Sequence, residues 1–464
     1  MATTTTFGAS HFATTDLGHK KRTECLVRIA DCIYRHPGGT LPAKFHAPKD
    51  YKAMVRLMNR PEVTHAAVLA PHYERTLALM YQTTNPVLIL HDTTELDYSG
   101  LNSITDLGPI GNGGCRGYLC HNSLAFDPDR REVLGLMSQI LHCREHVGPR
   151  ESAKSKRERA SRESRLWLRG MTATGPAPAE ASRLWVHVAD RGADTYEFFG
   201  NLVRQERSFV IRSCKNRCIR LGHKENDPSG YLHTYARSLQ LQGHRQVTVS
   251  ARDGCAERRA TLKVAFAPIL LWPPKACFGH YERRPVPLWV VYVREVEAPA
   301  GTAPLEWILL TNVPVTSLED AWERVSWYQC RWVLEEYHKA QKTGCAIEEL
   351  QFTSSQALQP MIALLSVAAV TLLNLRDASR RPDAKERPAT SVVDVSYVTV
   401  LSGWRHKTVR PDWSVHDFFY ALARLGGHQN RKRDSRPGWL VLWRGWMALQ
   451  HMVDGAEIGR KFRG

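Results

Sequence analysis

The sequence has no apolar run long enough to cross a membrane and no recognisable export signal. Its longest apolar stretch, Met361 to Leu373, is shorter than the roughly 20 residues that a spanning helix needs. The first ten residues, MATTTTFGAS, lack the basic and apolar blocks of a signal peptide. We therefore expect a buried core helix around 361–373, no membrane partner and a cytoplasmic location.

Regular cysteine pairs are also missing. The chain has 11 cysteines, an odd number without a framework, and no C-x-x-C pair. Cys115 with Cys120, or Cys214 and Cys218 with His223, leave a zinc site as an alternative, but buried thiols in a reducing compartment fit better.

The chain does contain a large excess of positive charge. Lysine and arginine total 63 against 46 acidic residues, a net charge of +17. Such an excess favours a polyanionic partner, with nucleic acid as the first candidate and a basic surface kept for solubility as the alternative. With 464 residues, 43% of them hydrophobic, the chain is long enough for two or three domains.

Two short apolar runs each end in an aspartate. Pro86 to Asp92 (PVLILHD) and Leu184 to Asp190 (LWVHVAD) have the composition of buried strands, so we expect Asp92 and Asp190 at strand ends. Asp97 and Asp194 follow closely, but an aspartate just past a strand is often a turn residue, and we rank both lower.

A third carboxylate is predicted on a long helix. Ser317 can cap this helix, and neither proline nor glycine interrupts it before Gly344. At 3.6 residues per turn, one face carries the following side chains: Tyr328, Arg331, Glu335 and Lys342.

Three clustered carboxylates need a cation. Like charges about 4 Å apart repel by roughly 4 kcal/mol at an effective dielectric near 20. Hard oxygen ligands favour Mg²⁺ or Mn²⁺, and two such ions can activate a nucleophile and steady a leaving oxygen. The sequence therefore predicts two-metal phosphoryl transfer at Asp92, Asp190 and Glu335.

These residues resemble those of bacterial DDE transposases of the insertion sequence four group, whose tyrosine-arginine-glutamate-lysine signature has two, three and six intervening residues. Tyr328 to Gly344 (YQCRWVLEEYHKAQKTG) matches this spacing and selects Glu335 over Glu336. Asp92 to Tyr98 (DTTELDY) and Asp190 to Asp194 (DRGAD) look like the two aspartate motifs. Segments at 306–311 and 421–427 are similar to the hairpin-forming composite-transposon branch.

The resemblance implies cut-and-paste transposition. Asp92, Asp190 and Glu335 would be the metal ligands, two ions per site. Double-stranded DNA, both transposon ends and target, would be the partner of a homodimer in a synaptic complex associated with the bacterial nucleoid. The implied DNA contacts are Tyr328, Arg331, Lys342, Arg212, Trp307 (stacking on a flipped base), Lys20, Arg22, Arg56 and Arg60.

Several of these residues also have plain structural readings. Trp307 lies in an apolar strand pattern where a core tryptophan is the default, Tyr328 can be a packing residue and Lys342 a solvated cation. A nuclease that does not join strands, and a catalytically silent DNA-binding protein, remain alternatives.

The expected fold class is α/β. A ribonuclease-H-like catalytic core at 76–378, with a mostly β insertion at about 213–310, would follow a helical DNA-binding domain at 1–75. The polar stretch Ser379 to Pro388 predicts a linker before a helical dimerisation region at 379–464, where Trp439, Trp443 and Trp446 recur at helical spacing.

Overall fold

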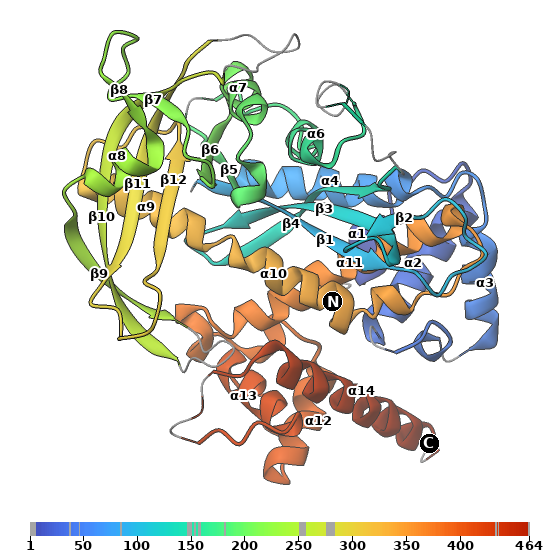
Figure 1. Ribbon diagram of the computed structural model, residues 1–464. Coiled ribbons are helices and arrows are strands. Elements are labelled where there is room, and N and C mark those ends of the chain that lie inside the picture. The colour runs from blue at the N-terminus through green and yellow to red at the C-terminus, as the bar shows by residue number, and fades with distance from the viewer. Residues whose placement is uncertain are drawn as a thin grey trace.

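A computed structural model describes residues 6–36, 39–45, 47–83, 86–145, 151–152, 155, 159–180, 182–249, 257–274, 284–431, 434 and 436–462. One large mixed sheet runs through the molecule, with helices on its faces and at both ends of the chain (Figure 1). The predicted α/β class with helical ends is therefore confirmed.

The N-terminal part is helical, with α1 (Phe7–Phe12), α2 (Lys20–Arg35), α3 (Pro48–Met58) and α4 (His65–Gln82). Helix α2 buries Leu26, Ile29, Ala30 and Ile33, whose spacing of three and four residues places them on one face. Helix α4 runs through the boundary expected at residue 75 and packs on β4 and α11. Its C-terminal half is therefore part of the central layer.

The first part of the sheet consists of six strands. Three of them, β1 (Val87–Asp97), β3 (Cys115–Asp127) and β4 (Glu132–His142), are antiparallel neighbours, and the short β2 (Gly108–Ile110) pairs with β3. On the other side of β1, β5 (Trp185–Ala189) and β6 (Ser208–Arg212) run parallel to it. Helices α6 (Leu166–Ala173) and α7 (Tyr196–Arg204) flank this part of the sheet (Figure 1).

One expectation about β1 was wrong. Asp92 was predicted at the end of its strand, but β1 continues to Asp97 and pairs with β3 throughout. The residues after Asp92 include Thr93 and Thr94, whose branched side chains suit a strand, and no glycine or proline stops it.

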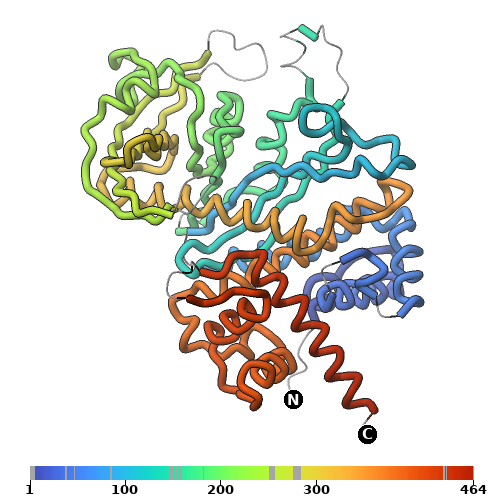
Figure 2. The backbone as a smooth tube through the Cα atoms, turned by 60° about the horizontal axis from the view of Figure 1, so that its bottom comes forward, coloured from blue at the N-terminus to red at the C-terminus, as the bar shows by residue number. Residues whose placement is uncertain are grey.

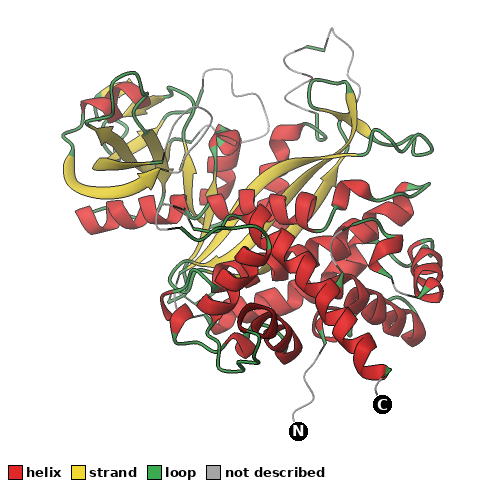
Figure 3. Ribbon diagram, turned by 90° about the horizontal axis from the view of Figure 1, so that it is seen from below, coloured by secondary structure: helices red, strands yellow, loops and turns green. Residues whose placement is uncertain are grey.

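The predicted β insertion extends the same sheet. It contains β7 (Cys218–Arg220), β8 (Ser229–Tyr231), α8 (Leu232–Ser238), β9 (Gln242–Val249), β10 (Arg258–Leu271), β11 (Val286–Val296) and β12 (Glu306–Thr311). Strand β12 pairs antiparallel with β6, so the order continues from β6 through β12, β11 and β10. Figure 3 shows these strands at one side of the molecule, beside the long central strands.

The long helix expected from Ser317 to Gly344 is divided. Helix α9 (Leu318–Gln329) begins with a capping box between Ser317 and Asp320, as the sequence indicated. It ends before Cys330, and α10 (Trp332–Lys339) then leads into the π-helical turn η4 (Ala340–Gly344). Hydrogen bonds three residues apart, from Val333 and Leu334 to Cys330 and Arg331, replace the regular ladder at the break.

Helix α11 (Ser355–Ala378) is the core helix that the sequence predicted. It is the one helix in the described ranges that is long and apolar enough to cross a membrane, but 83% of its most apolar window is buried inside the protein. Its position against α4, β4 and α10 accounts for its apolar character.

The C-terminal region contains α12 (Val395–His406), α13 (Val415–Leu425) and α14 (Trp439–Lys461), and Figure 2 shows α14 extending beside the N-terminal helices. Short 3₁₀ turns lie at Pro42–Lys44, Glu163–Arg165, Arg191–Ala193, Ile347–Glu349, Pro382–Lys385 and Ala389–Ser391. The Trp446 ring stacks on Tyr397 at 5.0 Å, and Trp439, Trp443 and Trp446 are all buried within the single chain. These tryptophans are core residues of the single chain, and the contact with a second subunit that was expected of their helix stays a prediction.

Candidate active site

Two aspartates lie at the same level on neighbouring strands, Asp92 within β1 and Asp190 directly after β5. Asp92 follows His91 in β1, Asp190 follows Ala189 at the end of β5, and His91 and Ala189 are register partners in the parallel pair. Adjacent strands lie about 4.8 Å apart, so the two carboxylates are near neighbours.

A tight turn fixes the second aspartate. The Asp190 carboxylate accepts a 2.8 Å hydrogen bond from the Gly192 backbone N–H at the start of the turn Arg191–Ala193. A Cβ atom at Gly192 would lie 2.8 Å from the Trp167 ring of α6. Glycine at this position therefore lets the turn pack directly on α6.

Helix α10 brings Glu335 to the aspartates through Arg331. The Arg331 guanidinium lies 3.3 Å from Asp92 Oδ2 and 2.7 Å from Glu335 Oε1. Its side chain is only 11% exposed, so the two ion pairs are largely shielded from water. Arg331 is thus the cation that links the strand carboxylate to the helix carboxylate.

The pKa of Asp92 is raised from its usual value to about 6. Burial is the main cause, the negative charge of Asp190 adds to it, and Glu335 acts in the same direction. The Arg331 charge and the hydrogen bond from the Thr93 N–H oppose this increase. The surplus of negative charge is therefore only partly compensated by the protein.

The carboxylates have the chemistry of a divalent-cation site but are not arranged as a finished one. Three carboxylate groups are hard oxygen donors of the kind that Mg²⁺ and Mn²⁺ prefer. Among the described residues, however, no three histidine, cysteine or acidic side chains form a ready ligand cluster. Arg331 stands between Asp92 and Glu335, so ligation by both would require this guanidinium to shift.

Tyr328 and Trp307 lie against each other beside this site. Tyr328 is 4% exposed, and its ring meets the half-buried Trp307 ring edge to face at 5.5 Å. Arg212, at the end of β6, donates a 3.0 Å hydrogen bond to the carbonyl of Glu306, next to Trp307. All three residues expected to contact DNA in this region therefore make contacts within the protein.

Lys342 is held away from the three carboxylates. It lies on the π-helical turn and pairs with Glu348 at 3.1 Å. Glu348 also accepts a hydrogen bond from the Asp97 N–H, which places Lys342 near the end of β1. Tyr328, Arg331, Glu335 and Lys342 therefore do not share one face of a single regular helix, because they are distributed over α9, α10 and the π-helical turn.

The acidic residues ranked lower have structural roles. Glu336 pairs with Arg376 and Lys339, away from Asp92. Asp194 is buried, pairs with Arg217 at 2.7 Å and accepts backbone hydrogen bonds from the β6–β7 connection. Asp97 accepts hydrogen bonds from Ser99 in a turn.

One contact that was not predicted lies one helical turn beyond Glu335. His338 Nε2 lies 3.2 Å from the Asn122 amide nitrogen, and Asn122 is the register partner of Asp92 in the antiparallel pair with β3. The offset of three residues from Glu335 could have indicated it, because residues three apart share a helix face. His338 thus connects α10 to the strand behind Asp92.

The N-terminal residues expected to bind DNA are spread over α2, α3 and the turn that follows α3. Lys20, Arg56 and Arg60 are exposed, whereas Arg22 pairs with Glu62 at 2.8 Å. The cysteines first weighed as zinc ligands lie in different environments: the Cys120 thiol is buried, which raises its pKa to about 12, while Cys214 and Cys218 are exposed.

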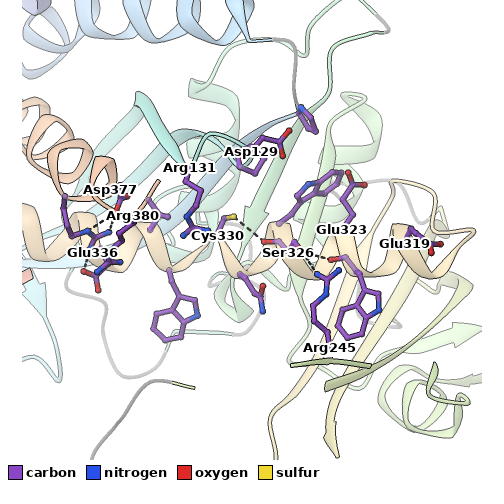
Figure 4. A pocket seen from close by; sticks show the side chains of 18 of the residues that line it. Asp129, Arg131, Arg245, Glu319, Glu323, Ser326, Cys330, Glu336, Asp377 and Arg380 are labelled. Carbon is purple, nitrogen blue, oxygen red and sulfur yellow. Dashed lines mark hydrogen bonds and ion pairs between the residues drawn. The ribbon is translucent and has the colours of Figure 1, made fainter. Parts of the chain in front are cut away.

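A cleft of about 830 Å³ is lined by residues of α9 and α10 other than Tyr328, Arg331 and Glu335. Figure 4 shows Glu336 and Arg380 at one end of it and Arg245 at the other, with Cys330 and Ser326 between them. Charges of both signs line this cleft. No known family model matches the chain.

Proposed function

We propose that this protein is a DDE-type DNA transposase, a metal-dependent polynucleotidyl transferase that excises and joins DNA, on a ribonuclease-H-like core. The observation that carries the proposal is the meeting of three carboxylates from three elements: Asp92 on β1, Asp190 after β5 and Glu335 on α10. The order β4, β3, β1, β5, β6, antiparallel and then parallel, supports the proposed core.

Asp92, Asp190 and Glu335 would hold Mg²⁺ or Mn²⁺, which when bound supplies Lewis acidity to the phosphate and lowers the pKa of a nucleophilic water or 3′-hydroxyl. Arg331 offers a planar donor pair that suits phosphate oxygens once it leaves Glu335. Exchange of this guanidinium between carboxylate and phosphate couples substrate arrival to the release of Glu335.

The aromatic pair supports the hairpin route that the resemblance suggests. Trp307 is half-buried and its ring meets that of Tyr328, so rotation of the Trp307 side chain would free an indole face. An indole face can stack on an unpaired base, with a stacking contribution of about 1–3 kcal/mol.

The decisive experiment incubates the protein with linear DNA that carries the genomic flanks of its own gene, with Mg²⁺ or with EDTA. We expect metal-dependent cuts at the flanks, mapped on denaturing gels, and joined products when a target plasmid is added. Glu335→Gln should abolish the cuts, whereas Glu319→Gln, an exposed glutamate in the first turn of α9, should keep them.

Each other outcome has a distinct meaning. Cuts without joined products would indicate a nuclease, and shifted but uncut DNA would indicate a silent binding protein. Cuts that persist in Glu335→Gln would refute the proposed catalytic carboxylates.

A further inference from the structure

Two clefts in the C-terminal region adjoin each other at one pair of aromatic rings. His416 and Tyr420 of α13, whose ring centroids lie 4.4 Å apart, line both clefts, which measure about 610 and 540 Å³. One cleft extends towards α12 and the other towards the linker and the start of α14.

Cations dominate the lining of both clefts. The linker cleft has four cations and no carboxylate, and the other has three cations with Asp412 and Asp417. We call the seven cations the α13 basic surface: Arg380, Arg381, Lys385 and Arg436 on the linker side, and Arg405, Arg410 and Arg424 on the other.

Most of these cations have no acidic partner. Within the part of the chain that the structure describes, Arg381 alone among the seven forms ion pairs, with Glu132 and Asp383. Elsewhere in the molecule, exposed arginines are commonly paired, as in Arg28 with Asp50 and Arg237 with Glu306. The α13 basic surface therefore keeps its positive charge for an external partner or for solvent.

The burial of Arg380 indicates that solvent is not the intended partner of every cation on this surface. It is half-buried, and burial together with the charge of Arg376 lowers its pKa. The nearest acidic groups, Asp377 and Glu336, are already paired with Arg376. A guanidinium that is partly removed from water without a hydrogen-bonded partner is costly, and an incoming anion would offset that cost.

The spread of the cations indicates the size of the anion. Because they line two clefts on both sides of the His416 and Tyr420 rings, a single phosphate cannot contact them all. The whole region at 379–464 has sixteen lysines and arginines against eight acidic residues, close to half of the net charge of the chain. An extended polymer of phosphates fits this distribution.

We infer that the α13 basic surface binds the sugar-phosphate backbone of double-stranded DNA without reading its sequence, as a site separate from the carboxylates. The site goes beyond the proposed catalytic function and gives the C-terminal region a role in addition to any contact between subunits. Arg380 also lines the cleft beside α9 and α10, so the α13 basic surface adjoins that cleft.

The test measures binding of the full-length protein to a 30-base-pair duplex of unrelated sequence in EDTA, by fluorescence anisotropy between 50 and 200 mM KCl. Lys385→Glu with Arg436→Glu should weaken binding at least tenfold at 100 mM KCl. Each lost phosphate contact should reduce the steepness of the negative slope of log affinity against log salt by about 0.9. The matched control, Arg204→Glu with Lys224→Glu, changes the same charge on exposed residues of α7 and the β7–β8 connection.

An equal loss in the control pair would show that only net charge matters and would overturn the site, as would parental affinity in the Lys385 and Arg436 variant. Lys385→Gln with Arg436→Gln should give an intermediate loss, and unchanged melting temperatures should accompany all variants. Because EDTA prevents metal-dependent cleavage, the assay measures binding alone. The test of the α13 basic surface therefore stays valid even if the protein does not cleave DNA at the flanks of its gene.

Discussion

At the scale of single residues, Arg331 is the cation that holds the charged groups of the candidate active site together. It holds Asp92 and Glu335 in one ion-pair network while Asp190 stays close enough to raise the pKa of Asp92. A protein cation thus partly neutralises a charge cluster that a divalent metal would neutralise better.

Asp92→Asn should therefore stabilise the fold while abolishing metal-dependent cleavage. The pKa of Asp92 is raised, so ionisation opposes folding: stability is highest below its ordinary pKa and declines as pH rises through about 6. At pH 7.5 the variant should gain roughly 1–3 kcal/mol, measured by urea unfolding. Asp97→Asn is the control, because that exposed turn carboxylate has a lowered pKa and its loss should not stabilise; equal stabilisation of both variants would contradict the repulsion described.

Metal binding should depend on pH for the same reason. Because protonation of Asp92 removes a ligand charge, the affinity for Mn²⁺ should fall as pH decreases through about 6. Titration calorimetry of the protein with Mn²⁺ at pH 5.5 and 7.5, in the absence of DNA, would measure this affinity. In Asp92→Asn the remaining pH dependence should be much weaker, and an unchanged profile would assign the titration to another group.

Helix α6 supports the candidate site at the scale of elements. Three buried histidines of β1, β3 and β5 lie side by side on the sheet and form a histidine layer, with His91 Nε2 lying 2.8 Å from His187 Nδ1 and His91 stacked near His121. Gly170 of α6 packs on His121 so closely that a Cβ atom would lie 2.3 Å from the ring nitrogen. The position of α6 thus depends on this glycine.

Gly170→Ala should destabilise the protein by roughly 1–3 kcal/mol, because α6 or the histidine layer must move. Gly200→Ala is a matched control in α7, where nothing lies within 4 Å of the new atom and helix propensity favours alanine. Thermal melting should show a lower melting temperature for Gly170→Ala and an unchanged or higher one for Gly200→Ala. A neutral Gly170→Ala would show that α6 is not fixed by this contact.

The C-terminal helices form a packed unit at the scale of the whole molecule. Helix α14 contacts α12 and α13, and His36 at the end of α2 approaches Asp454 of α14 at 3.8 Å. The N-terminal and C-terminal helices therefore meet although they are separated by the entire sheet in sequence (Figure 2).

Trp446→Ala should lower the melting temperature at every protein concentration. The cost should be about 3–5 kcal/mol, because a large buried ring that stacks on Tyr397 is lost within one chain. Leu440→Ala, in the same helix but 48% exposed, should change it little. If the effect of Trp446→Ala appeared only at concentrations where the protein associates, the ring would be an interface residue instead.

The sequence by itself determined the strand that carries Asp92, the strand that precedes Asp190, the capped start of α9 and the buried helix α11, because these depend on local periodicity, composition and capping. The selection of Glu335 over Glu336 as the third carboxylate came from the resemblance to the transposase signature. Tertiary structure decided the rest. Strand β1 runs past Asp92 because β3 offers it partners as far as Asp97. The helix breaks at Cys330, next to the Arg331 that pairs with Asp92. Lys342 pairs with Glu348, and the C-terminal tryptophans face inward, because contacts between distant segments are not encoded in any local pattern.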